Sequence, residues 1–212
     1  MKKSQIARAV EKVDRLPEFA RNRVFNMMIG RVVPFVGTSG LRITKATNNE
    51  WVASLENRRK VGNHLKQIHA CAMILIGETI GVMIMAMNLP GDRLPLVKNI
   101  EADFVKRSTG KLTGVVKLTD EQIAFIQREP KGELELEVTV TDEADVNPVL
   151  IRVTTAWIPK NPPADTADSV ASQFNVLSYG VAQIKRGCFQ SVSHCLPPLC
   201  RQYARASLWL CS

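Results

Sequence analysis

The chain has few of the residues that build metal centres and redox sites. Its 212 residues include three histidines and five cysteines, and no two cysteines stand in Cys-x-x-Cys spacing. A zinc ribbon or a dithiol redox motif needs such spacing, so the sequence supports neither. Four of the cysteines fall within the last 25 residues, where we expect reduced thiols. We therefore expect no metal and no cofactor.

The chain also lacks a long basic run and an aromatic-rich basic segment. Its net charge is +8, but the basic residues are scattered, with short groups at Arg58-Arg59-Lys60 and Lys106-Arg107. Single-stranded nucleic acid is bound by aromatic platforms beside basic grooves, and this chain holds only two tyrosines. The charge fits a smaller anionic partner such as a nucleotide-bearing substrate. We expect no nucleic acid as a partner.

The N-terminus lacks the unbroken apolar core of a signal peptide. Glu11, Lys12 and Asp14 interrupt it, and the pattern favours an amphipathic helix in a cytoplasmic protein. One segment, residues 70–89, is long enough to cross a bilayer. Glu78 lies in its middle and would cost about 2.5–3.5 kcal/mol on insertion. We therefore expect this segment in the protein core, and no membrane as a partner.

The pattern around this apolar segment predicts an α+β fold. Strands are predicted at 41–46, 51–55, 97–106, 111–118, 133–140 and 149–158, and helices at 4–30 with a break at Pro17, at 69–87 and at 119–128. Irregular chain is predicted at 34–40, which is rich in glycine. A curved antiparallel sheet of five to six strands would then wrap around one long buried helix, with further helices at the N-terminus.

The composition predicts three parts. Residues 1–30 form a helical segment that packs on the domain, and residues 31–160 form the domain itself. Residues 161–212 have weak periodicity and most of the cysteines. We interpret them as a C-terminal tail that is either mobile or not native to the domain.

Glu78 is the only charged residue in the apolar helix. Burying a lone carboxylate is costly, so the group has either a structural partner, such as a backbone group or a loop asparagine, or a chemical role. At the start of the same helix, the Ala70 N–H is a first-turn donor suited to an anion. The two groups lie about 12 Å apart along the axis at 1.5 Å per residue. Two antiparallel copies of the helix would bring them together in a dimer.

Asn63, His69-Ala70 and Glu78 together resemble the motif of the PaaI-like hotdog-fold acyl-CoA thioesterases. The resemblance covers residues 30–158 and is closest to a subgroup catalogued as a domain of unknown function. It implies a hotdog fold and a homodimer or homotetramer with the site at the subunit interface. It also implies that Asn63 and the Ala70 amide bind the thioester carbonyl. Glu78 of the partner subunit would be the general base or nucleophile, acting on an acyl-CoA or acyl-carrier substrate.

The same resemblance and the local charge suggest residues for substrate binding. These candidates are His69, Cys71, Arg58, Arg59, Lys60, Lys66, Lys106 and Arg107. Where many relatives have His-Gly-Gly, this chain has His69-Ala70-Cys71, and the larger side chains crowd the approach to the amide. A dehydratase of the same fold is disfavoured, because its catalytic His stands in a His-Phe-Pro-Gly loop. A non-catalytic hotdog module that binds acyl thioesters is the remaining alternative.

Overall fold

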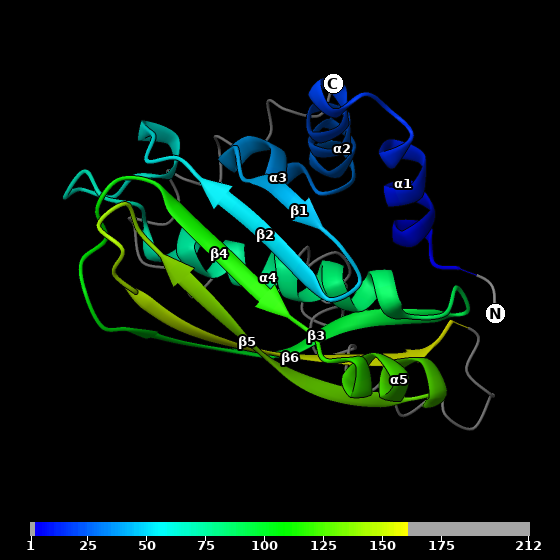
Figure 1. The fold of residues 1–212 in the computed structure, drawn as a ribbon. Coiled ribbons are helices and arrows are strands. Elements are labelled where there is room, and N and C mark those ends of the chain that lie inside the picture. The colour runs from blue at the N-terminus through cyan, green and yellow to red at the C-terminus, as the bar shows by residue number, and fades with distance from the viewer. Residues whose placement is uncertain (1–2, 161–212) are drawn as a thin grey trace, which may run out of the picture. The chain divides into compact units, whose positions relative to one another are not determined.

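The computed structural model describes residues 3–160, in which a six-stranded antiparallel sheet curls around one long helix (Figure 1). The strand order is β1-β2-β4-β5-β6-β3. The strands are β1 (Arg42–Ala46), β2 (Glu50–Leu55), β3 (Arg93–Phe104), β4 (Leu112–Lys117), β5 (Gly132–Thr141) and β6 (Val149–Pro159). The helices are α1 (Gln5–Asp14), α2 (Glu18–Val32), α3 (Pro34–Ser39), the 3-10 turn η1 (Arg59–Val61), α4 (Ala70–Asn88) and α5 (Asp120–Arg128). The predicted α+β architecture is confirmed. The tail predicted at 161–212 lies outside the described residues.

Helix α4 forms the centre of the core, and two of its glycines allow it to lie close to the inner face of the sheet. Gly77 of α4 packs against Ile151 of β6, and Gly81 packs against Val153. Four helical residues and two strand residues both advance about 6 Å, so α4 runs in the same direction as β6. The N-terminus of α4 therefore lies at the end of the sheet where β6 begins.

Gly114 of β4 lies directly against α4, and its replacement by valine should destabilise the fold. A Cβ at this position would overlap the Ile76 side chain, which is completely buried. We expect Gly114→Val to lower the free energy of unfolding by about 2–3 kcal/mol, because the close-packed core cannot absorb the added methyls. Urea denaturation measures this change. Thr113→Val, on the opposite face of the same strand, is the control; an equal loss there would contradict the explanation.

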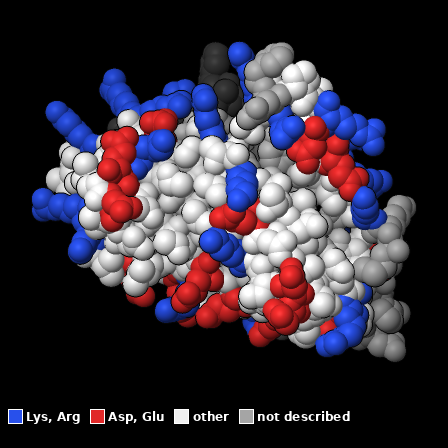
Figure 2. All heavy atoms as spheres, in the orientation of Figure 1, with Lys and Arg blue, Asp and Glu red and all other residues white. Residues whose placement is uncertain are grey.

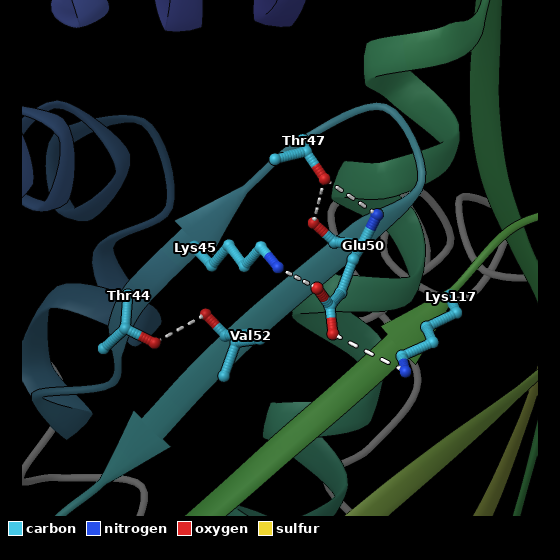
Figure 3. A network of polar contacts seen from close by, with 6 residues as sticks. All are labelled: Thr44, Lys45, Thr47, Glu50, Val52 and Lys117. Atoms are coloured by element: carbon cyan, nitrogen blue, oxygen red, sulfur yellow. Dashed lines mark hydrogen bonds and ion pairs between the residues drawn. The ribbon is translucent and has the colours of Figure 1, made fainter.

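The β1–β2 hairpin is held by a polar network on its outer side (Figure 3). The Glu50 carboxylate pairs with Lys45 and, at 3.8 Å, with Lys117. The Thr47 hydroxyl accepts a hydrogen bond from the Glu50 N–H at 3.0 Å and donates one to the Glu50 carbonyl at 3.0 Å. The hydrogen bond from Lys45 is the main reason why the pKa of Glu50 lies below its ordinary value. These charges therefore have structural partners.

Helix α2 covers the free edge of β1, and α3 packs against α2. The Asn26 side chain accepts a hydrogen bond from the Ile43 N–H at 2.6 Å and donates one to the Ile43 carbonyl at 2.8 Å, so it occupies the edge as a strand residue would. The prediction of irregular chain at 34–40 was wrong, since α3 lies there. Pro34 fixes a helical φ at the first turn, and Gly40 ends the helix with φ 75°.

The remaining predicted elements are confirmed with small shifts in their bounds. The largest shift is in β3, which begins at Arg93 instead of residue 97. Helix α5 begins at Asp120, one residue after the predicted start, and Thr119 caps it. The Thr119 hydroxyl accepts from the Gln122 N–H, and the Gln122 side chain accepts from the Thr119 N–H. A capping box is a local signal, which explains why the start of this helix could be predicted from the sequence to within one residue.

Candidate active site

Three loops meet at the end of the sheet where α4 begins (Figure 1). Strand pairing aligns Leu55 with Leu112 and Phe104 with Val149. The loops at 56–69, 105–111 and 142–148 therefore leave or enter the sheet at this one end. Asp142 joins two of them, because its carboxylate accepts hydrogen bonds from the backbone N–H groups of Val146, Thr109 and Ala144, which lower its pKa.

The first turn of α4 leaves one backbone donor free. His69 caps the helix, and its Nδ1 accepts a hydrogen bond from the Cys71 N–H at 3.1 Å. The N–H groups of Ala72 and Met73 donate to the His69 carbonyl. The Ala70 N–H has no hydrogen-bond partner within the described residues. With the helix dipole behind it, this N–H is the donor that remains for an external oxygen atom.

Asn63 organises the loop that precedes α4. Its Oδ1 accepts hydrogen bonds from the Leu65 N–H at 2.9 Å and the Gln67 N–H at 3.1 Å. The Asn63 oxygen therefore caps the turn formed by residues 63–67. Because two backbone donors point at one side-chain atom, that atom must be the oxygen. The Asn63 amide NH₂ makes no hydrogen bond among residues 3–160, so it is also a free donor.

Glu78 lies on the only face of α4 that the fold does not bury. Beyond the first turn, every position of α4 is buried except Met87 in the last turn and four half-buried positions, Ile74, Glu78, Val82 and Ala86. The spacing of four makes them one narrow stripe along the helix. No hydrogen bond or salt bridge to Glu78 occurs in the described part of the chain. Desolvation raises the pKa of this carboxyl above its ordinary value.

Glu78 and the two free donors cannot reach one reacting centre within a single chain. Glu78 is eight residues beyond Ala70 on the same helix, or about 12 Å along its axis. A carboxylate with a purely structural role would have a hydrogen-bond or salt-bridge partner, and Glu78 has neither within the described residues. Within one chain, the groups that were predicted to form the site therefore lie apart. A second chain packed along the half-buried stripe would bring them together.

The six basic residues predicted to bind substrate belong to the loops at this same end. They are Arg58, Arg59, Lys60, Lys66, Lys106 and Arg107, and all are exposed. None of them forms a salt bridge with a described residue. Figure 2 shows Lys and Arg side chains gathered over the η1 end of the molecule, beside a smaller acidic group. The loops therefore place free positive charge around the N-terminus of α4.

The sequence matches the model of one protein family. The model matches residues 21–158, from within α2 to the end of β6, and describes a domain of unknown function, DUF4442. The chain belongs to the DUF4442 family. None of the curated proteins matches it.

Solved structures show the fold of this DUF4442 domain. A Pseudomonas aeruginosa protein of unknown function, described as a probable thioesterase, matches with a TM-score of 0.60 and 21% identity, over 68% of this chain and 97% of that one. A Haemophilus influenzae thioesterase matches with a TM-score of 0.55 and 14% identity, over 68% of this chain and 94% of that one. A mutant Staphylococcus aureus thioesterase matches with a TM-score of 0.52 and 18% identity, over 60% of this chain and 100% of that one. The DUF4442 domain therefore has a hotdog fold.

Two roles in the DUF4442 domain were not visible from its sequence. His69 was predicted to contact substrate. Its Nδ1 already accepts the hydrogen bond that caps the helix, so only Nε2 remains for such a contact. The half-buried stripe that carries Glu78 could not be predicted, because the helix is apolar on every side. The only signal in the sequence was the pair of glycines, Gly77 and Gly81, on the side that packs against the sheet. Cys71 is exposed at the first turn, as a substrate contact requires.

Two further observations concern a metal and a membrane. Within residues 3–160, no three His, Cys, Asp or Glu side chains lie close enough together to hold a metal ion. Helix α4 is the one helix of the described part that is long and apolar enough to cross a membrane, and most of it is buried in the protein.

Proposed function

We propose that this DUF4442 protein hydrolyses acyl-CoA or acyl-carrier thioesters at a site shared by two chains. The observation that carries the proposal is the pair of unpaired groups on α4. A free N–H stands at Ala70, and a carboxylate without a partner stands at Glu78. A thioester hydrolase needs both a donor for the carbonyl oxygen and a base for water.

In the proposed mechanism, the Ala70 N–H and the Asn63 amide NH₂ of one chain donate to the thioester carbonyl oxygen. Each such donor is typically worth about 3 kcal/mol of transition-state stabilisation. Glu78 of the other chain removes a proton from water, which attacks the carbonyl carbon, or attacks it directly to form a mixed anhydride. The tetrahedral intermediate then collapses and expels the thiolate. A thiolate leaves readily, so no strong general acid is required.

The basic loops support the assignment of coenzyme A as the carrier. Arg58, Arg59 and Lys60 lie on η1 and its approach, directly before the Asn63 turn. Lys106 and Arg107 lie on the loop that Asp142 holds in place. Guanidinium and ammonium groups bind phosphates well, and these residues are exposed in the loops at the end of the sheet where α4 begins.

Two features support a dimer. The half-buried stripe of α4 would be covered by a second chain, which would also bring a second Glu78. The outer edge of β3 pairs with no strand in residues 3–160, although β3 is twelve residues long. A free edge of that length offers unpaired backbone groups to another chain. We therefore propose a homodimer, or a tetramer built from it, with one site at each end of the interface.

The direct test is thioester hydrolysis on a panel of short, medium, long and aromatic acyl-CoAs. We expect wild-type protein to turn over at least one member of the panel. A folded dimer that turns over none of them contradicts acyl-CoA hydrolysis. The same panel presented on acyl carrier protein then distinguishes the carrier.

Mixed subunits test whether the site is shared. Glu78→Gln removes the base, and Ala70→Pro removes the amide donor. In a mixed dimer one site carries both defects and the other carries neither, because each site takes the two groups from different chains. After subunit exchange of equal amounts of the two inactive variants, we expect about a quarter of wild-type activity. If Glu78 and Ala70 of the same chain act together, mixing restores nothing.

A non-catalytic binding module is the second candidate. The exposed Cys71 side chain beside the amide donor favours it, because a bulky first turn hinders the approach of an attacking water. Binding of a non-hydrolysable acyl-CoA analogue at equal affinity by wild type and Glu78→Gln, with no turnover of any thioester, would favour this reading over hydrolysis.

A further inference from the structure

The corner between α2 and α3, residues 27–35, exposes several large apolar side chains. Met27 is 56% exposed, Val32 76% and Phe35 59%. They occur within nine consecutive residues, in the second half of α2 and the first turn of α3. Monomeric proteins rarely gather exposed apolar side chains in this way unless the surface has a partner.

The corner lies in a segment without acidic residues. No Asp or Glu occurs from residue 19 to residue 49, while five basic residues do. Two of these basic residues form salt bridges. Lys45 pairs with Glu50 (Figure 3), and Arg21 Nε lies 3.6 Å from Asp14 Oδ1. Arg23 and Arg31 are exposed and form no salt bridge with a described residue. They stand four residues before and after Met27, on the same face of α2.

The corner is also rigid. The Asn26 side chain fastens α2 to the backbone of Ile43. A Cβ at Gly30 would lie 3.1 Å from the Gly37 Cα, so α2 and α3 are in backbone contact. A surface that is already ordered loses little conformational entropy when it binds.

We propose that the α2–α3 corner docks this protein on the surface of an anionic lipid bilayer. Val32, Phe35 and Met27 enter the boundary between headgroups and acyl chains, and Arg23 and Arg31 contact the lipid phosphates. This replaces the expectation of no membrane partner. That expectation depended on the cost of Glu78 in a membrane-spanning helix, and the corner binds without spanning.

A bilayer fits this surface better than a second copy of the chain. A symmetric contact would place the corner against itself and bring Arg23 and Arg31 of both copies together. The segment has no acidic residue to neutralise them. Anionic headgroups supply that charge, and the hydrocarbon below them accepts the apolar tips.

Sedimentation of the full-length protein with vesicles tests the proposal, and it requires no catalytic activity. We expect binding to phosphatidylcholine vesicles that contain 30% phosphatidylglycerol, weakened by salt, and little binding to phosphatidylcholine alone. We expect Val32→Ser/Phe35→Ser to lower the partition coefficient more than tenfold. Arg23→Gln/Arg31→Gln should lower it about thirtyfold. Leu150→Ser and Arg128→Gln, an exposed apolar residue and an exposed arginine elsewhere, should leave it unchanged.

Three outcomes would overturn the proposal. The first is equal binding to the two kinds of vesicle, and the second is unchanged binding by the two corner variants. The third is a loss of oligomer mass in Val32→Ser/Phe35→Ser without vesicle binding by wild type, which would assign the corner to a second copy. Thermal unfolding of each variant confirms that it is folded. Hydrolysis is measured separately, so a failure of the thioesterase proposal leaves this result intact.

Discussion

Glu78→Gln is expected to lower the rate of acyl-thioester hydrolysis by about 10²–10⁴-fold, which is the usual contribution of a general base. Glutamine has nearly the same shape but cannot accept the proton of the attacking water. The dimer should persist, because Glu78 has no hydrogen-bond partner in the described chain that its loss would leave unpaired. Steady-state kinetics and analytical ultracentrifugation measure the two quantities. Glu137→Gln, an exposed carboxylate on β5, is the matched control.

The pH dependence of the same pair of proteins checks the role of Glu78 independently. Desolvation raises the pKa of Glu78 above the ordinary value of 4.5. The basic form appears as the pH rises through this raised pKa, so wild-type kcat/KM should rise there, and the residual activity of Glu78→Gln should not follow it. If the variant keeps wild-type activity and pH profile, Glu78 is not the base.

Stability should change in the opposite direction to activity. A carboxyl with a raised pKa in the folded state destabilises that state once it is ionised. Below the ordinary pKa of glutamate, wild type and Glu78→Gln should be about equally stable. As the pH rises through the raised pKa, wild type should become the less stable of the two. Urea unfolding at several pH values measures this divergence.

Ala70→Pro is expected to reduce hydrolysis by about 10²–10³-fold while the fold stays intact. Proline removes one N–H group, and the loss of a single oxyanion donor has about this effect. The first helical position tolerates proline, and His69 already has the extended φ of −66° and ψ of 144° that a residue before proline adopts. Because the Ala70 N–H has no partner among the described residues, folding loses no hydrogen bond.

Ala70→Gly is the control for this substitution, because it keeps the N–H and removes only the methyl group. It should retain activity, and an increase would show that the methyl crowds the thioester. Urea denaturation should give Ala70→Pro the stability of wild type within about 0.5 kcal/mol. A stable Ala70→Pro that hydrolyses thioesters as fast as wild type would exclude the amide as the oxyanion donor.

Local signals were sufficient to predict most of the fold. Alternation in residues 133–140 identified β5, and the Thr119 capping box identified the start of α5. Helix α3 was missed because it is only six residues long, contains Gly37 and is followed directly by Gly40. It forms nevertheless, since Pro34 and Gly40 fix its two ends and its second turn packs against α2. Weak local propensity was overridden there by tertiary contact.

The candidate site was predictable only in part. The isolation of Glu78 in an apolar helix is a property of the sequence, and so are the positions of Asn63 and Ala70. Whether these groups are free depends on hydrogen bonds to other parts of the chain. The Asn63 oxygen accepts hydrogen bonds within its own turn, and His69 Nδ1 accepts one from the first turn of α4. Residue spacing alone did not predict either hydrogen bond.

The sequence by itself determined that a single carboxylate would sit in the core helix of a strand-rich domain, because desolvation and periodicity act over a few residues. Only the tertiary structure decided which face of that helix stays open, which first-turn N–H remains unpaired and which three loops meet beside it. These features depend on strand pairing and packing between residues far apart in the chain, such as Gly114 with Ile76 and Phe104 with Val149. Local patterns carry no information about such distant partners.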